Sequence, residues 1–392
     1  MELWDLKDPR DPSYSFVTVD PPRFGVCSNT DPLARRAIWN KASPSLADRV
    51  QVISQWLERC FREHPTCGVV QTTYPARLLD LGSDPVLPSV KLVRLDQIEE
   101  ALSPIHYVAL SHCWGLSTRP PYKTTRANYS DHTRHIPIAA LSRTFQDAIR
   151  VTRALGIRFI WIDSLCIIQD DADDWAAEAV KMASVYQGSY FTIAATSSPD
   201  GDGGLFLDPP APATLIYVEP DNGLLDVKGN SLHRCFIRHP VASPSVIWDA
   251  PLSQRAWVLQ EQILSARLIH FTEHQMYYQC NSGLESEDGI VDTADLSSVR
   301  GRAFRHHGKQ DLRTPVRAVG TWWSWVADYS SRSLSFHSDR MAAIAGILRY
   351  YQDATRQVPI LGLWEGTLWY DLGWTVEHDG SHDIAHCRIP AK

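Results

Sequence analysis

Several features that would assign this chain to a common functional class are missing. Its 392 residues carry a net charge of −7 and no dense stripe of lysine and arginine, so the electrostatic footprint of a nucleic-acid-binding protein is absent. The longest apolar runs are far shorter than a membrane span, and no basic region followed by an apolar one follows Met1. We therefore expect a cytoplasmic protein with neither a nucleic-acid partner nor a membrane partner.

Cysteine is infrequent, and the common nucleotide-binding and catalytic motifs are absent from the sequence. Eight cysteines spread over a chain of this size do not form a dense disulfide framework, which suits a reducing compartment. The sequence has no Gly-x-Gly-x-x-Gly after a predicted strand, no Walker loop, no Gly-x-Ser-x-Gly elbow and no His-Glu-x-x-His. A dinucleotide held by the usual glycine turn is therefore not predicted, and no cofactor is assigned with certainty.

What the chain does contain is a repeated design of three short apolar runs. The runs cover residues 105–110, 157–162 and 190–195, and each ends abruptly in small polar or thiol side chains. Between them lie segments 141–155 and 172–187, whose apolar residues recur at helical spacing. Apolar runs that alternate with helices of about four turns predict a βαβαβ unit, in which a parallel sheet is covered on both faces.

Polar and thiol side chains follow each predicted strand. Because the carboxyl ends of parallel strands meet at one edge of a sheet, where open α/β folds bind ligands, we expect these side chains to converge. They are Ser111, His112, Cys113, Asp163, Ser164, Cys166, Thr196 and Ser197, and Trp114 is counted with them as a ligand-binding residue. The sequence thus predicts a small-molecule ligand in a crevice at the strand ends.

Composition divides the rest of the chain into regions around this core. Residues 1–45 predict an extended arm, and residues 46–205 an α/β core that begins with a helix and a hairpin. Prolines break residues 206–282 into a β-rich segment that also contains a helix at 254–264. Residues 283–392 predict a charged loop followed by a helical C-terminal region. Further expected elements are helices at 46–63, 321–329 and 339–351, strands at 215–218, 225–227, 235–237, 268–271 and 275–280, and a hairpin formed by 75–82 and 90–95.

Two carboxylates are candidates for catalysis. Glu178 lies on the border of the buried face of the second predicted helix, where partial desolvation raises the pKa of a carboxyl group toward the range useful for proton transfer. The alternative is an ion pair with a base such as Lys181. Asp163, at a strand end, either orients a ligand hydroxyl or a nearby histidine, or caps the backbone of residues 164–166.

Three groupings have the residue types of metal sites. Residues 170–174 have the two-plus-one aspartate spacing that holds magnesium and a diphosphate in all-helical folds, but here capping of the following helix is preferred. Cys60, His64 and Cys67 have zinc ligand types, but no fourth ligand with matching spacing lies nearby. His378, His382 and His386 also have zinc ligand types, but they include Gly380 in a context that disfavours a helix. No metal ligand is predicted on this basis.

Tryptophan is abundant, with 14 residues, and many of them stand beside charged or turn residues. Aromatic side chains of this size either anchor the packing between elements or line an aromatic cavity. The sequence leaves both roles open.

Three sequence blocks carry a resemblance to a known family. They are YVALSHCWG at 107–115, RFIWIDSLCIIQDD at 158–171, and the set Asp174-Trp175, Glu178, Met182, Val185-Tyr186 and Thr192-Ile193-Ala194-Ala195. These blocks resemble the HET (heterokaryon incompatibility) domain of filamentous fungi. The resemblance covers most of residues 50–375 and includes Arg255-Ala256-Trp257 with Gln260-Glu261, so that Arg255 and Trp257 are counted as ligand-binding residues.

The resemblance implies a TIR-like, flavodoxin-like α/β core and a role in non-self recognition and programmed cell death. TIR-like domains cleave NAD at the nicotinamide bond with a glutamate. By analogy, NAD is a candidate substrate and Glu178 a candidate catalytic residue, together with Asp163, Ser111 and His112. A homo-oligomer or a signalling partner is also implied.

Two other functions remain open. The sequence includes no NACHT, ankyrin or WD-repeat sensor, which leaves room for a cofactor-independent cyclase of a fungal natural-product pathway. Such an enzyme needs an apolar cavity, a few hydrogen-bond donors and shape complementarity to a folded transition state. The third function is a non-enzymatic death-signalling module, which predicts an exposed apolar patch and oligomerisation.

Overall fold

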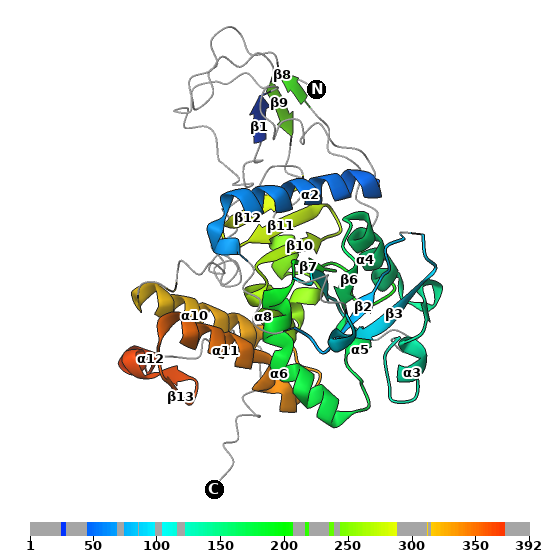
Figure 1. Ribbon diagram of the computed structural model, residues 1–392. Helices are drawn as coiled ribbons and strands as arrows, with labels where there is room; N and C mark the ends of the chain where they lie inside the picture. Colours follow the sequence, from blue (N-terminus) through cyan, green and yellow to red (C-terminus); the bar gives the residue numbers. More distant parts are fainter. Residues whose placement is uncertain are drawn as a thin grey trace.

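The computed structural model of the protein describes most of the chain (Figure 1). The residues it describes are 25–28, 45–68, 74–84, 86–98, 104–115, 122–206, 216–218, 235–238, 244–287, 312 and 315–372. The expected strand at 225–227 and the three C-terminal histidines at 378, 382 and 386 lie outside these residues. None of the helices within them has the length and apolar character needed to cross a membrane.

A nine-stranded sheet organises the described part of the chain, in the order β12-β11-β10-β7-β4-β6-β2-β3-β5. Its four central strands, β10, β7, β4 and β6, are parallel, as expected for the core, but the strands on both sides of them are antiparallel. The sheet is therefore mixed. The strands are β2 (Arg77–Asp80), β3 (Ser89–Arg94), β4 (Tyr107–Ser111), β5 (Ile136–Pro137), β6 (Phe159–Trp161), β7 (Phe191–Ala194), β10 (Arg267–Phe271), β11 (Met276–Cys280) and β12 (Gly283–Ser286).

The two predicted crossover helices are confirmed. Helix α4 (Arg143–Ala154) connects β4 to β6, and α6 (Ala172–Gly188) connects β6 to β7. Helix α4 ends before Gly156, whose φ of +73° is the left-handed conformation that favours glycine. Asp171 is the N-cap of α6, and its side chain accepts hydrogen bonds from the backbone N–H groups of residues 173 and 174. Within residues 170–174 the expected cap is made by Asp171, whereas Asp174 forms an ion pair with Arg77.

Alternation along β4 places the two crossover helices on opposite faces of the sheet. The Tyr107 hydroxyl donates a 2.7 Å hydrogen bond to the Val185 carbonyl of α6. His112 lies an odd number of residues after Tyr107. Its imidazole packs edge-on against Phe145 of α4, with ring centroids 4.9 Å apart. Because successive side chains of a strand point to opposite faces, Ser111 shares the α6 face with Tyr107 and His112 takes the other face.

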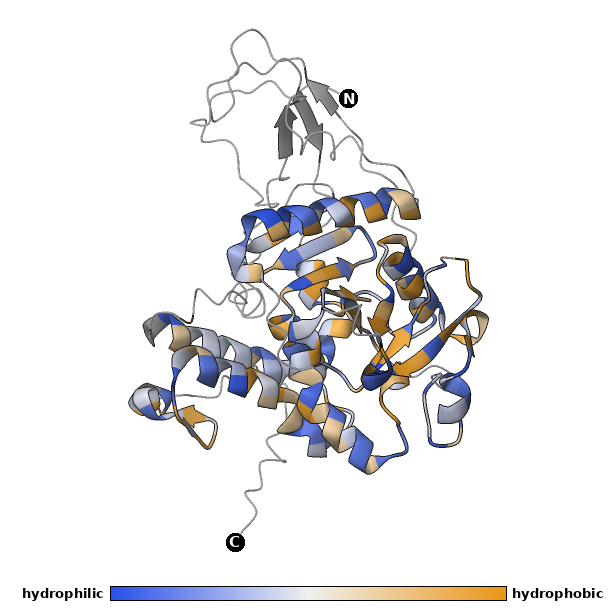
Figure 2. Cartoon of the chain, in the orientation of Figure 1, coloured by the Kyte–Doolittle hydropathy of each residue, from blue (hydrophilic) through white to orange (hydrophobic). Residues whose placement is uncertain are grey.

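Further helices complete the two layers (Figure 1). Helix α2 packs against α4 and β11 on one side, while α8, α10 and α11 pack against one another, and α8 and α11 also pack against α6. Strands inside the core carry many hydrophobic residues, while the outward side of α2 is hydrophilic (Figure 2), as expected for a buried sheet. The helices are α2 (Leu46–Glu63), α3 (Tyr129–His132), α5 (Asp163–Cys166), α7 (Ser245–Trp248), α8 (Ala256–Leu264), α10 (Pro315–Ser331), α11 (Ala342–Thr355) and α12 (Leu368–Asp371).

Strand pairing crosses the regional boundaries drawn from composition. Strand β10 pairs in parallel with β7 and so continues the core sheet beyond residue 206. Strand β1 (Gly25–Ser28), in the expected arm, forms a separate three-stranded antiparallel sheet with β8 (Ile216–Val218) and β9 (Cys235–Arg238). A short hairpin, β13 (Pro359–Ile360) and β14 (Leu363–Trp364), lies in the C-terminal region. Composition did not indicate these pairings, because the backbone hydrogen bonds between strands do not depend on particular residue types.

Candidate functional site

A pocket of about 1110 Å³ lies at the carboxyl ends of the central strands. Segments that follow three different strands contribute to its lining, and α6, α8 and residues 333–339 complete it. The lining includes Cys113, Trp114 and Gly115 after β4, Asp163 after β6, Pro199 and Asp200 after β7, Trp175, Ala179 and Met182 on α6, and Arg255, Trp257 and Glu261 at α8. The pocket therefore occupies the edge of the sheet that the sequence indicated.

Five of the predicted site residues line this pocket: Cys113, Trp114, Asp163, Arg255 and Trp257. A smaller adjoining cavity of about 310 Å³ shares Cys113 and Trp114 and is also lined by His112. The remaining predicted residues do not belong to the lining of either cavity. They are Ser111, Ser164, Cys166, Glu178, Thr196 and Ser197.

Asp163 connects the ends of two strands. Its Oδ2 accepts a 2.9 Å hydrogen bond from Trp114 Nε1, and its Oδ1 accepts one of 2.6 Å from the Ser164 backbone N–H. His112 Nδ1 lies 3.8 Å from the same Oδ1. Asp163 thus accepts one bond from the backbone that follows it and one from the Trp114 indole. A carboxylate whose two oxygens both accept N–H bonds is held in a fixed orientation at the pocket.

Gly115 allows the segments after β4 and β7 to approach closely. Its φ is +70°, and a Cβ atom at this position would lie 2.9 Å from the Cα of Asp200. Any other residue at position 115 would combine backbone strain with a collision against main-chain atoms. The glycine therefore shapes the wall of the pocket.

Glu261 is the functional candidate that sequence reasoning did not select. Its side chain is only 5% exposed and lies on α8, at the pocket. Burial raises the pKa of Glu261 to about 7, while the charge of Arg255 and the hydroxyls of Ser111 and Tyr186 limit the rise. One signal was available: Glu261 is the lone acid in an otherwise apolar and amide-bearing helix. A buried carboxyl group with a pKa near neutrality is a candidate for proton transfer.

Arg255 connects the start of α8 to the segment that follows β4. Its Nη1 donates a hydrogen bond to the backbone carbonyl of His112, and its guanidinium lines the pocket together with Lys123. The pocket lining therefore combines two cationic side chains with four acidic ones, Asp163, Asp200, Glu261 and Asp339.

The two thiols near the strand ends are protonated at neutral pH. Burial raises the pKa of Cys113 to about 11 and that of Cys166 to about 12. A thiol with a raised pKa is a poor nucleophile, so thiolate chemistry has no support here. Burial also lowers the pKa of His112, which keeps its imidazole neutral.

Glu178 adopts the ion-pair arrangement that was its alternative role. Its side chain is 2% exposed, its Oε1 lies 2.8 Å from Lys181 Nζ, and its Oε2 accepts a 3.3 Å hydrogen bond from the Ala76 backbone N–H. These contacts hold the carboxylate toward the segment that leads into β2, and Glu178 is not part of the pocket lining.

Thr196 and Ser197 make contacts beside β10 instead of in the pocket. Thr196 Oγ1 lies 3.1 Å from His270 Nδ1, and Ser197 Oγ accepts a 3.0 Å hydrogen bond from the Glu273 backbone N–H. Their hydroxyls therefore hold the neighbouring strand in place.

Tryptophan takes both roles that its abundance suggested. Trp114, Trp175 and Trp257 line the pocket, and the rings of Trp175 and Trp257 meet edge to face with centroids 6.5 Å apart. Others are fully buried packing anchors, namely Trp56, Trp161, Trp322, Trp325 and Trp364. Indole rings around a pocket offer flat apolar surfaces for a planar ligand group.

Comparison with known proteins identifies the family of this core. Residues 107–261 match the family described as Heterokaryon incompatibility protein (HET). A stretch of 96 residues is 29% identical to Heterokaryon incompatibility protein 6, OR allele, of Neurospora crassa, and covers 23% of this chain and 14% of that protein. No solved structure matches the chain. Residues 107–261 thus match the HET family, in agreement with the resemblance of the sequence blocks, and the chain spans about a seventh of the curated relative that it matches.

Proposed function

We propose that this HET-domain chain is a cytoplasmic effector of fungal non-self recognition and programmed cell death, and that its pocket hydrolyses NAD at the nicotinamide bond. The observation that carries the proposal is the pairing of Glu261, whose pKa is raised to about 7, with Asp163 in one pocket at the strand ends. One group is suited to move a proton and the other to hold a negative charge.

The strand order supports a flavodoxin-like, TIR-like core. In chain order the parallel strands are β4, β6, β7 and β10, and in space they lie as β6-β4-β7-β10. The first strand therefore lies between the second and the third, which is the doubly wound order of flavodoxin-like sheets. Ligands of such sheets bind where the winding reverses direction, beside the first strand, and the pocket contains residues that follow β4, β6 and β7.

The chemistry requires one bond to break and one to form. The bond between ribose C1′ and the nicotinamide nitrogen breaks, the electron pair leaves with neutral nicotinamide, and positive charge develops on the ribose. The carboxylate of Asp163 stabilises this charge. Ionised Glu261 takes the proton of the water that attacks C1′, and the products are nicotinamide, ADP-ribose and one proton.

The other pocket residues suit the rest of the substrate. The indoles of Trp114, Trp175 and Trp257 offer stacking surfaces for its flat rings. Arg255 and Lys123 supply positive charge for a diphosphate. The thiol of Cys113 stays protonated and contributes to packing.

The test measures nicotinamide released from NAD by the purified full chain. We expect Glu261→Gln and Asp163→Asn each to reduce kcat/KM by about 100-fold or more, and the wild-type kcat/KM to rise with pH through about 7 because the base must be ionised. Asp147→Asn is the matched control, since Asp147 is a 2% exposed carboxylate on α4 outside the pocket lining.

A comparison with Glu178→Gln decides between the two glutamates. If hydrolysis depends on the ion-paired Glu178 while Glu261→Gln stays active, the assignment of the base to Glu261 is wrong. If the wild-type chain releases no nicotinamide above a protein-free blank, the hydrolase proposal fails. Induced expression in a filamentous fungus adds an independent result, because the wild-type chain should kill cells and Glu261→Gln should not.

The aromatic and aliphatic part of the lining favours a second candidate, a cofactor-independent cyclase. Ile167, Met182 and Leu334 join the three indoles around the same space, and such a surface can fold an apolar polyene toward a cyclic transition state. This function predicts tight binding of a polycyclic apolar product and no release of nicotinamide. A third outcome, cell killing without turnover, would indicate a signalling module, for which Phe336 and Met341 offer exposed apolar surface.

A further inference from the structure

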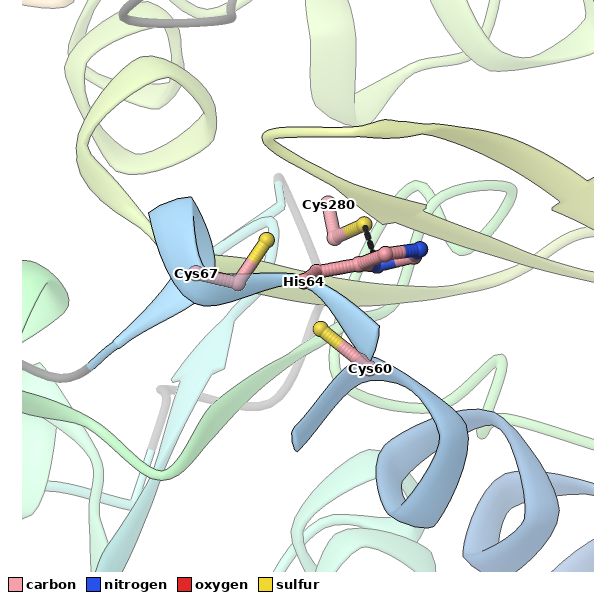
Figure 3. Close-up of side chains that lie close together, drawn as sticks. All are labelled: Cys60, His64, Cys67 and Cys280. Atoms are coloured by element: carbon pink, nitrogen blue, oxygen red, sulfur yellow. Dashed lines mark hydrogen bonds between the residues drawn. The ribbon is translucent and has the colours of Figure 1, made fainter. Parts of the chain in front are cut away.

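Four metal-ligand side chains meet far from the pocket, at the junction of α2 with β11. Cys60 is in the last turn of α2, His64 follows its end, Cys67 is in the short helix η1 (Pro65–Cys67), and Cys280 ends β11. Figure 3 shows the four side chains directed toward one another, although His64 and Cys280 are 216 positions apart in the sequence. The first three have zinc ligand types but lacked a fourth ligand nearby in sequence, and Cys280 supplies it.

The spacing of the ligand atoms fits one tetrahedral ion. The three Sγ atoms and the imidazole nitrogen all lie within 4.8 Å of one another, and Cys280 Sγ is 3.4 Å from His64 Nδ1. In a tetrahedral zinc site with Zn–S near 2.3 Å and Zn–N near 2.0–2.1 Å, ligand atoms are roughly 3.4–3.8 Å apart. Adjustments of about 1 Å or less would close the site around an ion.

The chemistry of the cluster favours zinc over other occupants. Three thiol groups and one imidazole form a soft Cys₃His donor set, which is typical of structural zinc. None of the three cysteines is in a disulfide. They are 0%, 1% and 7% exposed, in the order Cys60, Cys67 and Cys280, so no open position is left for a substrate. The site therefore has the closed form of a structural centre.

Neighbouring donors are placed to support thiolate ligands. The Ser282 backbone N–H donates a 3.4 Å hydrogen bond to Cys280 Sγ, and the Ser282 hydroxyl lies 3.8 Å from Cys67 Sγ. Donors of this kind, one layer outside the ligands, offset thiolate charge and fix the geometry of metal centres.

We propose that Cys60, His64, Cys67 and Cys280 bind one structural zinc ion, which joins the N-terminal helix to the edge of the core sheet. Both segments lie outside residues 107–261, which match the family. Two direct hydrogen bonds already brace the junction, from Arg267 Nη1 to the Cys67 carbonyl at 2.5 Å and from Asn281 Nδ2 to the Thr66 carbonyl at 3.0 Å. The unfolded chain does not hold the four ligands together, so the free energy of zinc binding contributes to folding.

The first experiment measures metal content in the full chain, purified without chelators and without a metal-affinity column. The wild-type chain should hold about one zinc per chain, and Cys280→Ala should lose it. Cys113→Ala is the matched control, because Cys113 is a free cysteine of similar burial, 5% against 7% exposed, outside the cluster. It should keep the zinc. Full zinc content in Cys280→Ala, or wild-type chain without zinc, overturns the proposal.

The second experiment uses the wild-type chain alone, in case Cys280→Ala fails to fold. Zinc is removed with a chelator, and Co²⁺ is added as the probe under reducing conditions. We expect the visible bands of tetrahedral cobalt and a thiolate charge-transfer band, both lost when Zn²⁺ is added, and a lower melting temperature for the metal-free chain. An octahedral cobalt spectrum, or a disulfide between any two of the three cysteines in the freshly purified chain, overturns the proposal. Neither experiment depends on NAD hydrolysis.

Discussion

The indole Nε1 of Trp114 donates a 2.9 Å hydrogen bond to Oδ2 of Asp163, and this bond joins the ends of strands β4 and β6 at the wall of the pocket. Each residue lies within three positions of the end of its strand, and the strands are parallel neighbours. The bond thus connects residues of two sequence blocks and fixes the orientation of the Asp163 carboxylate at the pocket.

Replacing Trp114 tests this relationship. Trp114→Phe keeps an aromatic ring but removes the donor, so one Asp163 oxygen loses its partner. We expect the free energy of unfolding to fall by about 1–3 kcal/mol and the proposed release of nicotinamide from NAD to become slower, because the carboxylate is no longer oriented. Urea denaturation of Trp114→Phe, Asp163→Asn and the double variant gives the coupling between them. Strictly additive effects would show that the hydrogen bond has no energetic role.

The raised pKa of Glu261 makes stability depend on pH. The folded chain binds this proton more tightly than the unfolded chain, since burial raises the pKa from 4.5 to about 7. The stabilising contribution is therefore complete below about pH 4.5 and is lost as the pH rises through 7. Relative to wild type, Glu261→Gln should gain roughly 3 kcal/mol of unfolding free energy between pH 4.5 and pH 8.

Urea titrations of both proteins across this range provide the measurement. His112, whose pKa is lowered by burial, loses its contribution in the opposite direction, as the pH falls, but it is present in both proteins and cancels in their difference. Parallel curves for wild type and Glu261→Gln would mean that Glu261 titrates normally.

A buried ion pair connects the C-terminal helices to the pocket. Arg332 lies 2.8 Å from Asp328, both side chains are under 5% exposed, and Arg332 also donates to Gln262 of α8 at 3.0 Å and to the Arg255 carbonyl at 3.4 Å. Arg332→Met should lower the free energy of unfolding by about 3–5 kcal/mol, because it leaves a charge buried without its main partner.

The control for this variant is Arg94→Met, which breaks an exposed pair with Asp96. It should change the unfolding free energy by less than about 1 kcal/mol. Chemical denaturation of both variants gives the comparison. Equal losses would contradict the idea that burial makes the Arg332 pair important.

Much of the central fold was predictable because its information is local. The apolar runs that became β4, β6 and β7, and the helical spacing that became α4 and α6, follow from periodicity alone. The positions of the outer strands of the sheet were less predictable from the sequence. The hairpin of β2 and β3 was expected, but not its place beside β6, and the strand pair of β10 and β11 was expected, but not its parallel contact with β7.

The candidate site was predictable only in part. Asp163, Trp114 and Cys113 were found because each follows a predicted strand, and their place in the pocket needs only the rule for parallel sheets. The position of Glu178 on a helix predicts a catalytic role or an ion pair. Which neighbour it contacts depends on packing, and in the structure it pairs with Lys181. Glu261 was passed over because its raised pKa comes from burial by elements distant in sequence.

Sequence by itself determined the βαβαβ core, the edge of the sheet that carries the polar side chains, and the HET resemblance, since each depends on residue order within a short stretch. Only the tertiary structure decided that Glu261 faces the pocket, and that Cys280 completes a cluster with Cys60, His64 and Cys67. The physical reason is the same in both cases. Burial and ligand geometry depend on which distant segments pack together, and a one-dimensional pattern does not contain those distances.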